Sequence, residues 1–249
     1  MTIHEYGDRN KPHILLIHGM WMCHEMMLPY VEKFRGDYHI IAPDLTGHGD
    51  DQGCFAGAEK DALELGKWLA DHDINTLDLV FSASMGCVVA MYLVADNPGL
   101  NVKCSVLEGA ALTRMKGVEW LFRAMMGGMQ KRPDMISSMY SSVVMEGDVQ
   151  RKVADAMRRT DKAALNCMVH TCNSFRYEQC LLPADMQKRL YFEFGSKDSH
   201  IVCRKLINRY YPGAGITVRK GYGHCVYMFK HQKEYGDILG SYMDRAGEI

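Results

Sequence analysis

A serine stands where an apolar run of the sequence gives way to small residues. Residues 79–86 read Leu-Val-Phe-Ser-Ala-Ser-Met-Gly, so the run ends on the pattern Ser-x-Ser-x-Gly and a helical pattern follows. This order is typical of a sharp strand-to-helix turn that exposes a serine hydroxyl and aims the next backbone N–H groups at the atom it attacks. We therefore predict that Ser84 is a nucleophile. The alternative for this segment alone is a serine that caps the amino end of a helix.

A serine hydroxyl is a weak nucleophile at neutral pH and needs a base, a group that orients the base, and donors for the developing oxyanion. His224 lies in a glycine-containing loop after the last predicted strand and is the predicted base. Asp198 follows the preceding predicted strand and is the predicted acid. The chain order Ser, Asp, His is one of the known triad orders. Alternatively Asp198 caps the following helix, and Glu108, after an earlier strand, is the acid.

Backbone N–H groups are the predicted oxyanion donors. Met85 follows the serine and starts a helix, whose amino end favours negative charge. Met20 follows His18 and Gly19, and the glycine lets the backbone approach a ligand closely. We expect His18 and His48 to have structural roles. Since they stand on separate loops without metal-ligand spacing, no metal and no cofactor is predicted.

The elements that must position these residues alternate along the chain. Seven short apolar runs are predicted strands: Ile3–Tyr6, His13–Ile17, Tyr38–Ala42, Leu77–Phe81, Val102–Leu107, Arg189–Phe194 and Gly215–Arg219. Helical patterns lie between or after them: Met22–Phe34, Ala58–Ala70, Met85–Ala95, Val202–Tyr210 and Val226–Tyr242. This alternation favours an α/β fold with a mostly parallel sheet and helices on both faces.

The alternation stops between residues 111 and 183, which are rich in methionine and show only helical patterns. The predicted helices there are Val118–Met129, Pro133–Met145, Asp148–Arg159 and Lys162–Cys172. We predict a core domain of residues 1–110 and 184–249 with a helical cap, 111–183, over the active-site edge. Trp21, Trp120 and Phe122 are candidate pocket residues, and flexible methionines suit a loosely specified apolar ligand.

Size and composition limit the function classes. A chain of 249 residues with a formal net charge of −1 has no broad basic surface, so nucleic acid is not an expected partner. No apolar run reaches the length of a membrane span, and the first residues do not resemble a signal peptide. Nine scattered cysteines are typical of reduced thiols in a cytoplasmic protein. The sequence leaves open whether the protein is a monomer or a homodimer.

The chain resembles the α/β-hydrolase fold superfamily, in its cap-bearing serine hydrolase and esterase lineage. The resemblance rests on five elements in order: His18-Gly19-Met20-Trp21, the stretch Pro-Asp-Leu-Thr-Gly-His-Gly at 43–49, Ser82–Gly86, Gly195-x-x-Asp198, and Gly223-His224. It implies an eight-stranded, mostly parallel sheet with a helical cap between the sixth and seventh strands. One departure is Ser82, where the family turn usually has glycine; because serine is nearly as small, we expect the turn to form.

Together these features predict a carboxylesterase that acts on a small or medium apolar ester through an acyl-enzyme and needs no cofactor. The same residues also serve C–C bond hydrolysis, acyl transfer, lactone opening and cyanohydrin cleavage in this superfamily, and fold does not decide between them. A slow-turnover receptor for a small molecule is a further alternative. Haloalkane dehalogenases and cap-type epoxide hydrolases share the architecture but use a carboxylate where this chain has Ser84.

Overall fold

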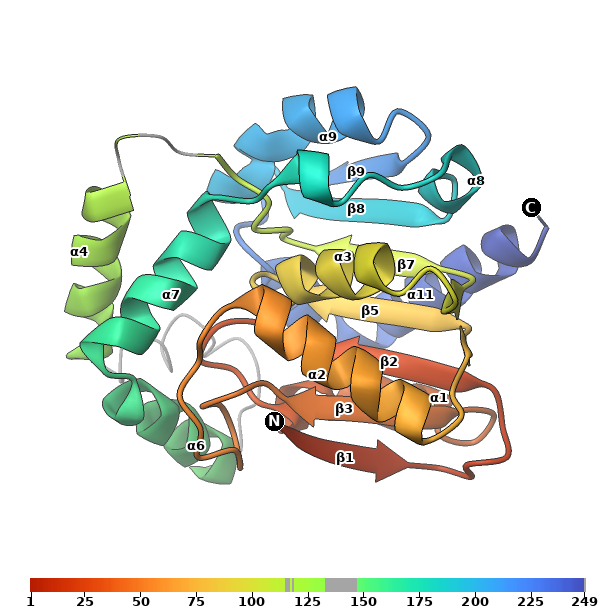
Figure 1. Cartoon of the computed structure of the whole chain (residues 1–249), viewed down its shortest axis with the longest axis horizontal. Coiled ribbons are helices and arrows are strands. Elements are labelled where there is room, and N and C mark those ends of the chain that lie inside the picture. The colour runs from red at the N-terminus through yellow and green to blue at the C-terminus, as the bar shows by residue number, and fades with distance from the viewer. Residues whose placement is uncertain (115–116, 118, 133–146, 249) are drawn as a thin grey trace.

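A seven-stranded sheet runs through the centre of the molecule, with helices on both faces (Figure 1). The computed structural model describes residues 1–114, 117, 119–132 and 147–248. Across the sheet the strands lie in the order β1 (Thr2–Tyr6), β3 (His39–Asp44), β2 (His13–Ile17), β5 (Leu79–Ala83), β7 (Ser105–Glu108), β8 (Leu190–Gly195) and β9 (Gly215–Arg219). Strand β1 pairs antiparallel with β3, and the other neighbours are parallel. The predicted α/β class is confirmed.

The sheet has one strand fewer, among the described residues, than the eight that the resemblance implied. The apolar runs of the chain itself predicted seven. Two of those runs, Leu77–Phe81 and Val102–Leu107, start before the matching strands of the main sheet, because each begins in a short segment that pairs elsewhere. These segments, β4 (Thr76–Leu77) and β6 (Asn101–Val102), form a separate parallel pair.

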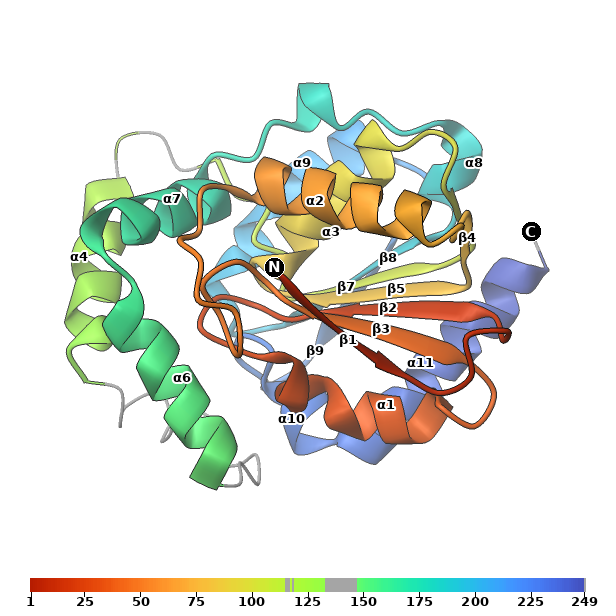
Figure 2. The same cartoon turned by 60° about the horizontal axis from the view of Figure 1, so that its bottom comes forward.

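The central strands are apolar on both faces because helices cover both. Every residue of β5 is buried, and so is Ile14–Ile17 of β2. Helices α2 (Ala58–Asp71) and α3 (Gly86–Asp96) cover one face, and α1 (Leu28–Phe34) and α11 (Gln232–Gly247) cover the other (Figure 2). The remaining helices of the core are short: α8 (Ala184–Gln187), α9 (Arg204–Tyr210), α10 (Val226–Lys230) and the 3-10 turns His24–Met27, Tyr177–Gln179 and Ser199–Cys203.

Two predicted helices are interrupted. The segment predicted as Met22–Phe34 is a 3-10 turn followed by α1, and α1 starts just before Pro29, since proline fits only the first turn of an α-helix. The segment predicted as Val226–Tyr242 divides into α10 and α11 at His231, whose φ of −122° and ψ of 46° are not helical. Both interruptions depend on local backbone geometry, which the hydrophobic periodicity of the sequence does not predict.

The helical insertion lies between β7 and β8 and stands beyond the carboxyl ends of the parallel strands (Figure 1). Its described helices are α4 (Glu119–Gln130), α6 (Gly147–Arg159) and α7 (Lys162–Asn173). In this sheet it separates the fifth and sixth strands along the chain, not the sixth and seventh. The predicted helix Pro133–Met145 lies outside the described residues. None of the helices described is long and apolar enough to cross a lipid bilayer.

Candidate active site

The turn between β5 and α3 holds Ser84 in a left-handed backbone conformation. Its φ is 53°, and its N–H donates a 2.8 Å hydrogen bond to the carbonyl oxygen of Glu108 at the end of β7. A Cβ atom on Gly86 would lie only 2.3 Å from the carbonyl oxygen of His18, so this position of the turn requires glycine. Ser82, in the first position, is buried and compatible with the turn, as expected from its size.

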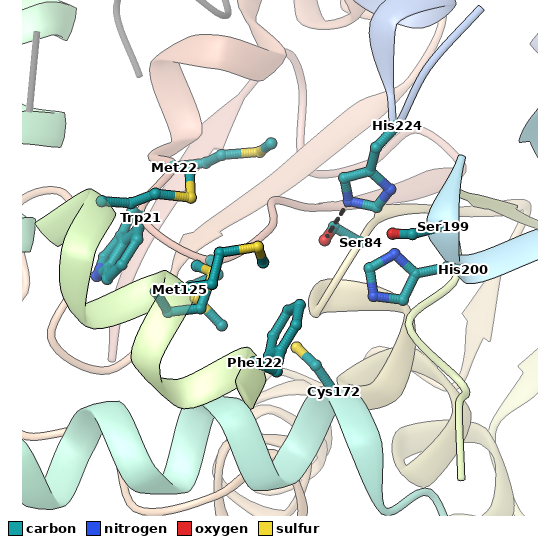
Figure 3. A pocket seen from close by; sticks show the side chains of 12 residues that line it. Trp21, Met22, Ser84, Phe122, Met125, Cys172, Ser199, His200 and His224 are labelled. Atoms are coloured by element: carbon teal, nitrogen blue, oxygen red, sulfur yellow. Dashed lines mark hydrogen bonds between the residues drawn. The ribbon is translucent and has the colours of Figure 1, made fainter. Parts of the chain in front are cut away.

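The structure brings Ser84, His224 and Asp198 together. His224 Nε2 lies 2.8 Å from Ser84 Oγ (Figure 3), and His224 Nδ1 lies 3.0 Å from Asp198 Oδ2. Burial alone would raise the pKa of Asp198, but the contacts of its carboxylate with His200, including the backbone N–H, and with the His224 ring hold that pKa well below its ordinary value. The ionised carboxylate accepts a hydrogen bond from the Nδ1–H group of His224, which leaves the Nε2 lone pair facing the serine hydroxyl.

Glu108, the alternative acid, contacts a different partner. Its side chain is buried and accepts a 2.9 Å hydrogen bond from the hydroxyl of Tyr235. Burial raises the pKa of Glu108 to about 8, so the carboxyl is mainly uncharged at neutral pH. Among the described residues, Asp198 is therefore the acid that contacts His224.

The two predicted oxyanion donors flank the serine. In the part of the chain that the structure describes, the N–H groups of Met20 and Met85 donate to no other protein group. A Cβ atom on Gly19 would lie 2.9 Å from Ser84 Cβ, so glycine allows this loop to lie against the serine. His18 holds the loop: its Nδ1 donates to the Gly19 carbonyl at 2.7 Å, and its Nε2 accepts from the Leu45 N–H at 3.0 Å.

A cavity of about 370 Å³ opens onto the serine. Its described lining residues are Met20, Trp21, Met22, Ser84, Phe122, Met125, Met126, Met129, Cys172, Ser199, His200 and His224. Figure 3 shows two unlike walls: Trp21, Met22 and Met125 face His224, Ser199 and His200 across the cavity. The cavity thus combines an apolar, sulfur-rich wall with a polar wall that carries the reactive groups.

One candidate pocket residue is wrongly predicted. Trp120 is 66% exposed and is absent from the cavity lining, whereas Trp21 and Phe122 line it. Two residues along an α-helix are about 200° apart, so Trp120 points away from the side on which Phe122 lies. The tryptophan and the phenylalanine of one helix could not both face the cavity.

Several lining residues were missed. Met125, Met126 and Met129 follow the predicted Phe122 at the spacing i+3, i+4 and i+7, which marks one face of a helix and could have identified the wall. Gly109 was also missed: its φ is +60°, and a Cβ atom there would lie 2.7–2.9 Å from Cys225 Sγ and the His224 ring. No sequence signal distinguishes this glycine from others that end a strand.

Two groups of described side chains are close enough to share a cation. One contains the acid and base of the site. The other, His4, His24, Asp44 and Asp50, lies in the amino-terminal part of the chain. There Asp44 accepts hydrogen bonds from both histidine rings and from the N–H groups of His24 and Asp50, while Lys152 pairs with Asp50 at 2.7 Å. These contacts already stabilise Asp44 as a loop-organising carboxylate.

A comparison of the sequence with models of known protein families establishes the family of this chain. The family model described as the alpha/beta hydrolase family matches residues 14–236. The chain belongs to the alpha/beta hydrolase family. Sequence similarity to a curated protein is more limited: the chain is 30% identical over 112 residues to the (E)-2-((N-methylformamido)methylene)succinate hydrolase of Acinetobacter baylyi. That match covers 43% of this chain and 41% of the relative, so the chain spans about two fifths of that protein.

Solved structures of this family share the fold of the whole chain. A thermophilic esterase from Thermogutta terrifontis has a TM-score of 0.74 at 15% identity, over 98% of this chain and 93% of the esterase. An esterase from Exiguobacterium antarcticum has a TM-score of 0.74 at 14% identity, over 97% and 94%. At this identity the likeness establishes the fold alone.

Proposed function

We propose that this alpha/beta hydrolase is a serine carboxylesterase for small or medium esters of low polarity. The observation that carries the proposal is the contact of His224 Nε2 with Ser84 Oγ at 2.8 Å, with Asp198 on the other ring nitrogen at 3.0 Å. The cavity beside the serine supports an uncharged substrate, because its described lining contains neither lysine nor arginine. The esterases among the structural neighbours are consistent with this chemistry.

In this mechanism His224 takes the proton of Ser84 as Oγ attacks the ester carbonyl carbon. The resulting oxyanion accepts hydrogen bonds from the N–H groups of Met20 and Met85. When the tetrahedral intermediate collapses, the carbon–oxygen bond to the alcohol breaks and His224 gives its proton to the leaving oxygen. A water molecule then attacks the acyl-enzyme, again losing its proton to His224, and the acid is released as Ser84 recovers its proton.

We further propose that residues 111–183 form a cap domain on a core of residues 1–110 and 184–249. Helix α4 contributes Phe122 and three methionines to the cavity, so the insertion supplies the surface that a substrate chain would contact. Methionine is unbranched and polarizable, and it adapts to irregular apolar shapes. Such a wall favours a class of apolar groups over one closely fitted substrate.

The hydrolase from A. baylyi supports a second candidate, because the substrate in its name is an amide-bearing dicarboxylate. The same triad can hydrolyse bonds other than esters. A dicarboxylate would require cationic partners, however, and the described cavity wall offers none of them. We therefore place the ester first.

The test is turnover of p-nitrophenyl acetate, butyrate and octanoate by wild type, Ser84→Ala and the control Ser241→Ala. We expect Ser84→Ala to lower kcat by roughly 10⁴- to 10⁶-fold, as triad knock-outs do elsewhere. Ser241, an exposed residue of α11, should be replaceable without effect. Full activity in Ser84→Ala would refute the assignment. A wild-type protein that hydrolyses none of these esters would favour another reaction or a receptor.

A further inference from the structure

A second histidine lies beside the base in the same cavity. His200 is 8% exposed, and the centre of its ring is 4.7 Å from that of His224. Its ring also contacts Phe122 edge-on, with centroids 6.5 Å apart. His200 therefore touches both the reactive wall and the wall that the insertion supplies, although the mechanism above gives it no role.

Both ring nitrogens of His200 lack a hydrogen-bond partner among the described residues. Nδ1 is buried and lies 3.4 Å from Asp198 Oδ1, without hydrogen-bond geometry. Asp198 Oδ1 is instead bonded to the backbone N–H of His200 at 2.8 Å. Nε2 is not among the buried unpartnered atoms, and none of the described residues forms a hydrogen bond with it, so it is accessible from the cavity that the ring lines.

The surroundings decide which nitrogen of His200 carries the proton. Burial lowers the pKa of His200, so the ring is neutral at neutral pH and one nitrogen is protonated. Because the Asp198 carboxylate is ionised, the protonated nitrogen is Nδ1, which faces it. Nε2 then presents a lone pair to the cavity. Because this lone pair receives no hydrogen bond from the described residues, the nitrogen can accept one from a ligand that brings a donor.

We propose that His200 is a specificity-determining residue that accepts a hydrogen bond from a hydroxyl or N–H group of the substrate. This inference rests on the proposed esterase function and narrows its substrate class. The preferred ester carries a donor close to its carbonyl, since His200 adjoins the histidine that contacts Ser84. The apolar remainder of the ester lies against the methionines of α4. Ser199, exposed at the edge of the same wall, adds a second polar group there.

Pairs of esters that differ in one hydrogen-bond donor distinguish recognition of that donor by His200 from a general effect of His200 on turnover. The substrates are p-nitrophenyl butyrate, its 2-hydroxy and 3-hydroxy derivatives, and the corresponding methoxy esters, which keep the oxygen and lose the donor. We expect wild type to prefer one hydroxy ester over its methoxy partner by about 10-fold or more in kcat/KM. In His200→Phe this ratio should fall to near one, whatever the change in the turnover of butyrate itself. His200→Gln, which retains an acceptor, should restore part of the preference.

A control variant and two contrary results complete this test. His72→Phe, at the exposed residue that follows α2, should keep the wild-type ratio. Equal kcat/KM for hydroxy and methoxy esters in wild type would overturn the proposal. So would an equal loss on all esters in His200→Phe, since that result means His200 only positions the triad through Asp198.

A binding experiment separates failure of this inference from failure of the esterase assignment. If wild type hydrolyses none of these esters, the same hydroxy and methoxy pairs are titrated calorimetrically into Ser84→Ala and Ser84→Ala/His200→Phe. Tighter binding of a hydroxy ester that disappears with His200 supports the role of His200 without esterase activity. Equal affinity of both proteins for both esters overturns it.

Discussion

The two walls of the cavity are fixed by different kinds of structure. The reactive wall stands at the carboxyl ends of sheet strands, where backbone hydrogen bonds and close glycine contacts leave Ser84 and His224 little freedom. The opposite wall combines Trp21 and Met22 with one face of α4, a helix of the insertion that contacts α7 and leaves Met125 half exposed. We therefore expect the core to fix the relative positions of Ser84 and His224, and α4 of the insertion to contribute to which groups fit the cavity.

The largest effect is expected from replacing the acid of the reactive wall, Asp198. Asp198→Asn keeps the size of the side chain but removes the charge that orients and stabilises the protonated His224, and we expect kcat to fall by about 10⁴-fold. Glu108→Gln, which changes the alternative acid in the same way, should alter kcat by only a few-fold. Steady-state kinetics of both variants on one ester show which of the two carboxyl groups acts with His224. A larger loss in Glu108→Gln would contradict the acid proposed here.

A second variant tests how tightly the reactive wall is packed. In Gly109→Ala the new methyl group would lie within 2.9 Å of the His224 ring at a φ of +60°, so the imidazole must move. We expect kcat to fall about 100-fold and the free energy of unfolding to drop by about 1–2 kcal/mol. Gly99→Ala, where no atom lies within 4 Å, is the matched control. Wild-type kinetics in Gly109→Ala would show that the wall tolerates displacement.

The buried carboxyl group of Glu108, behind the reactive wall, should make the stability of the protein depend on pH. Burial raises the pKa of Glu108 to about 8, so between pH 5 and 8 the folded protein holds a proton that the unfolded chain releases. The free energy of unfolding should therefore fall as pH rises through this range, by up to about 1.4 kcal/mol per pH unit, and level off above it. Urea unfolding of wild type and Glu108→Gln at several pH values measures this contribution. The same pH slope in both proteins would count against a protonated Glu108.

The smallest effect concerns a hydrogen bond between the core and the insertion. Trp21 Nε1 donates a 3.1 Å hydrogen bond to Thr160 Oγ1, which joins the core to the segment between α6 and α7. Trp21→Phe should lower local stability there by about 1 kcal/mol and speed amide exchange in α6 and α7 about 5-fold. Amide exchange in β5 should not change. Thr160→Val is the paired variant, and faster exchange throughout the protein would mean that the two regions unfold as one unit.

The reactive wall could be predicted from the sequence because local patterns determine it. A serine between small residues after an apolar run, and a histidine after the last strand, each specify a place at the same edge of a parallel sheet. The sequence favoured Asp198 as the acid but left Glu108 as an alternative. Both follow strands, and which way a carboxyl points depends on the packing of distant elements such as α11, which carries Tyr235.

The opposite wall could be predicted only in part. A helix near α4 was expected, but the face it turns to the cavity depends on contacts with the core, so Trp120 was misplaced and Met126 was missed. His200 was missed for a different reason. It lies two residues after Asp198 in a 3-10 turn, and only the chain reversal there brings its ring beside His224.

The central claim is that His224 and Asp198 activate Ser84, and intact-mass analysis after treatment with a small fluorophosphonate tests it most directly. The account predicts one adduct per chain in wild type and none in Ser84→Ala under the same conditions. An adduct of equal yield in both proteins, or no adduct on folded wild type, would contradict it.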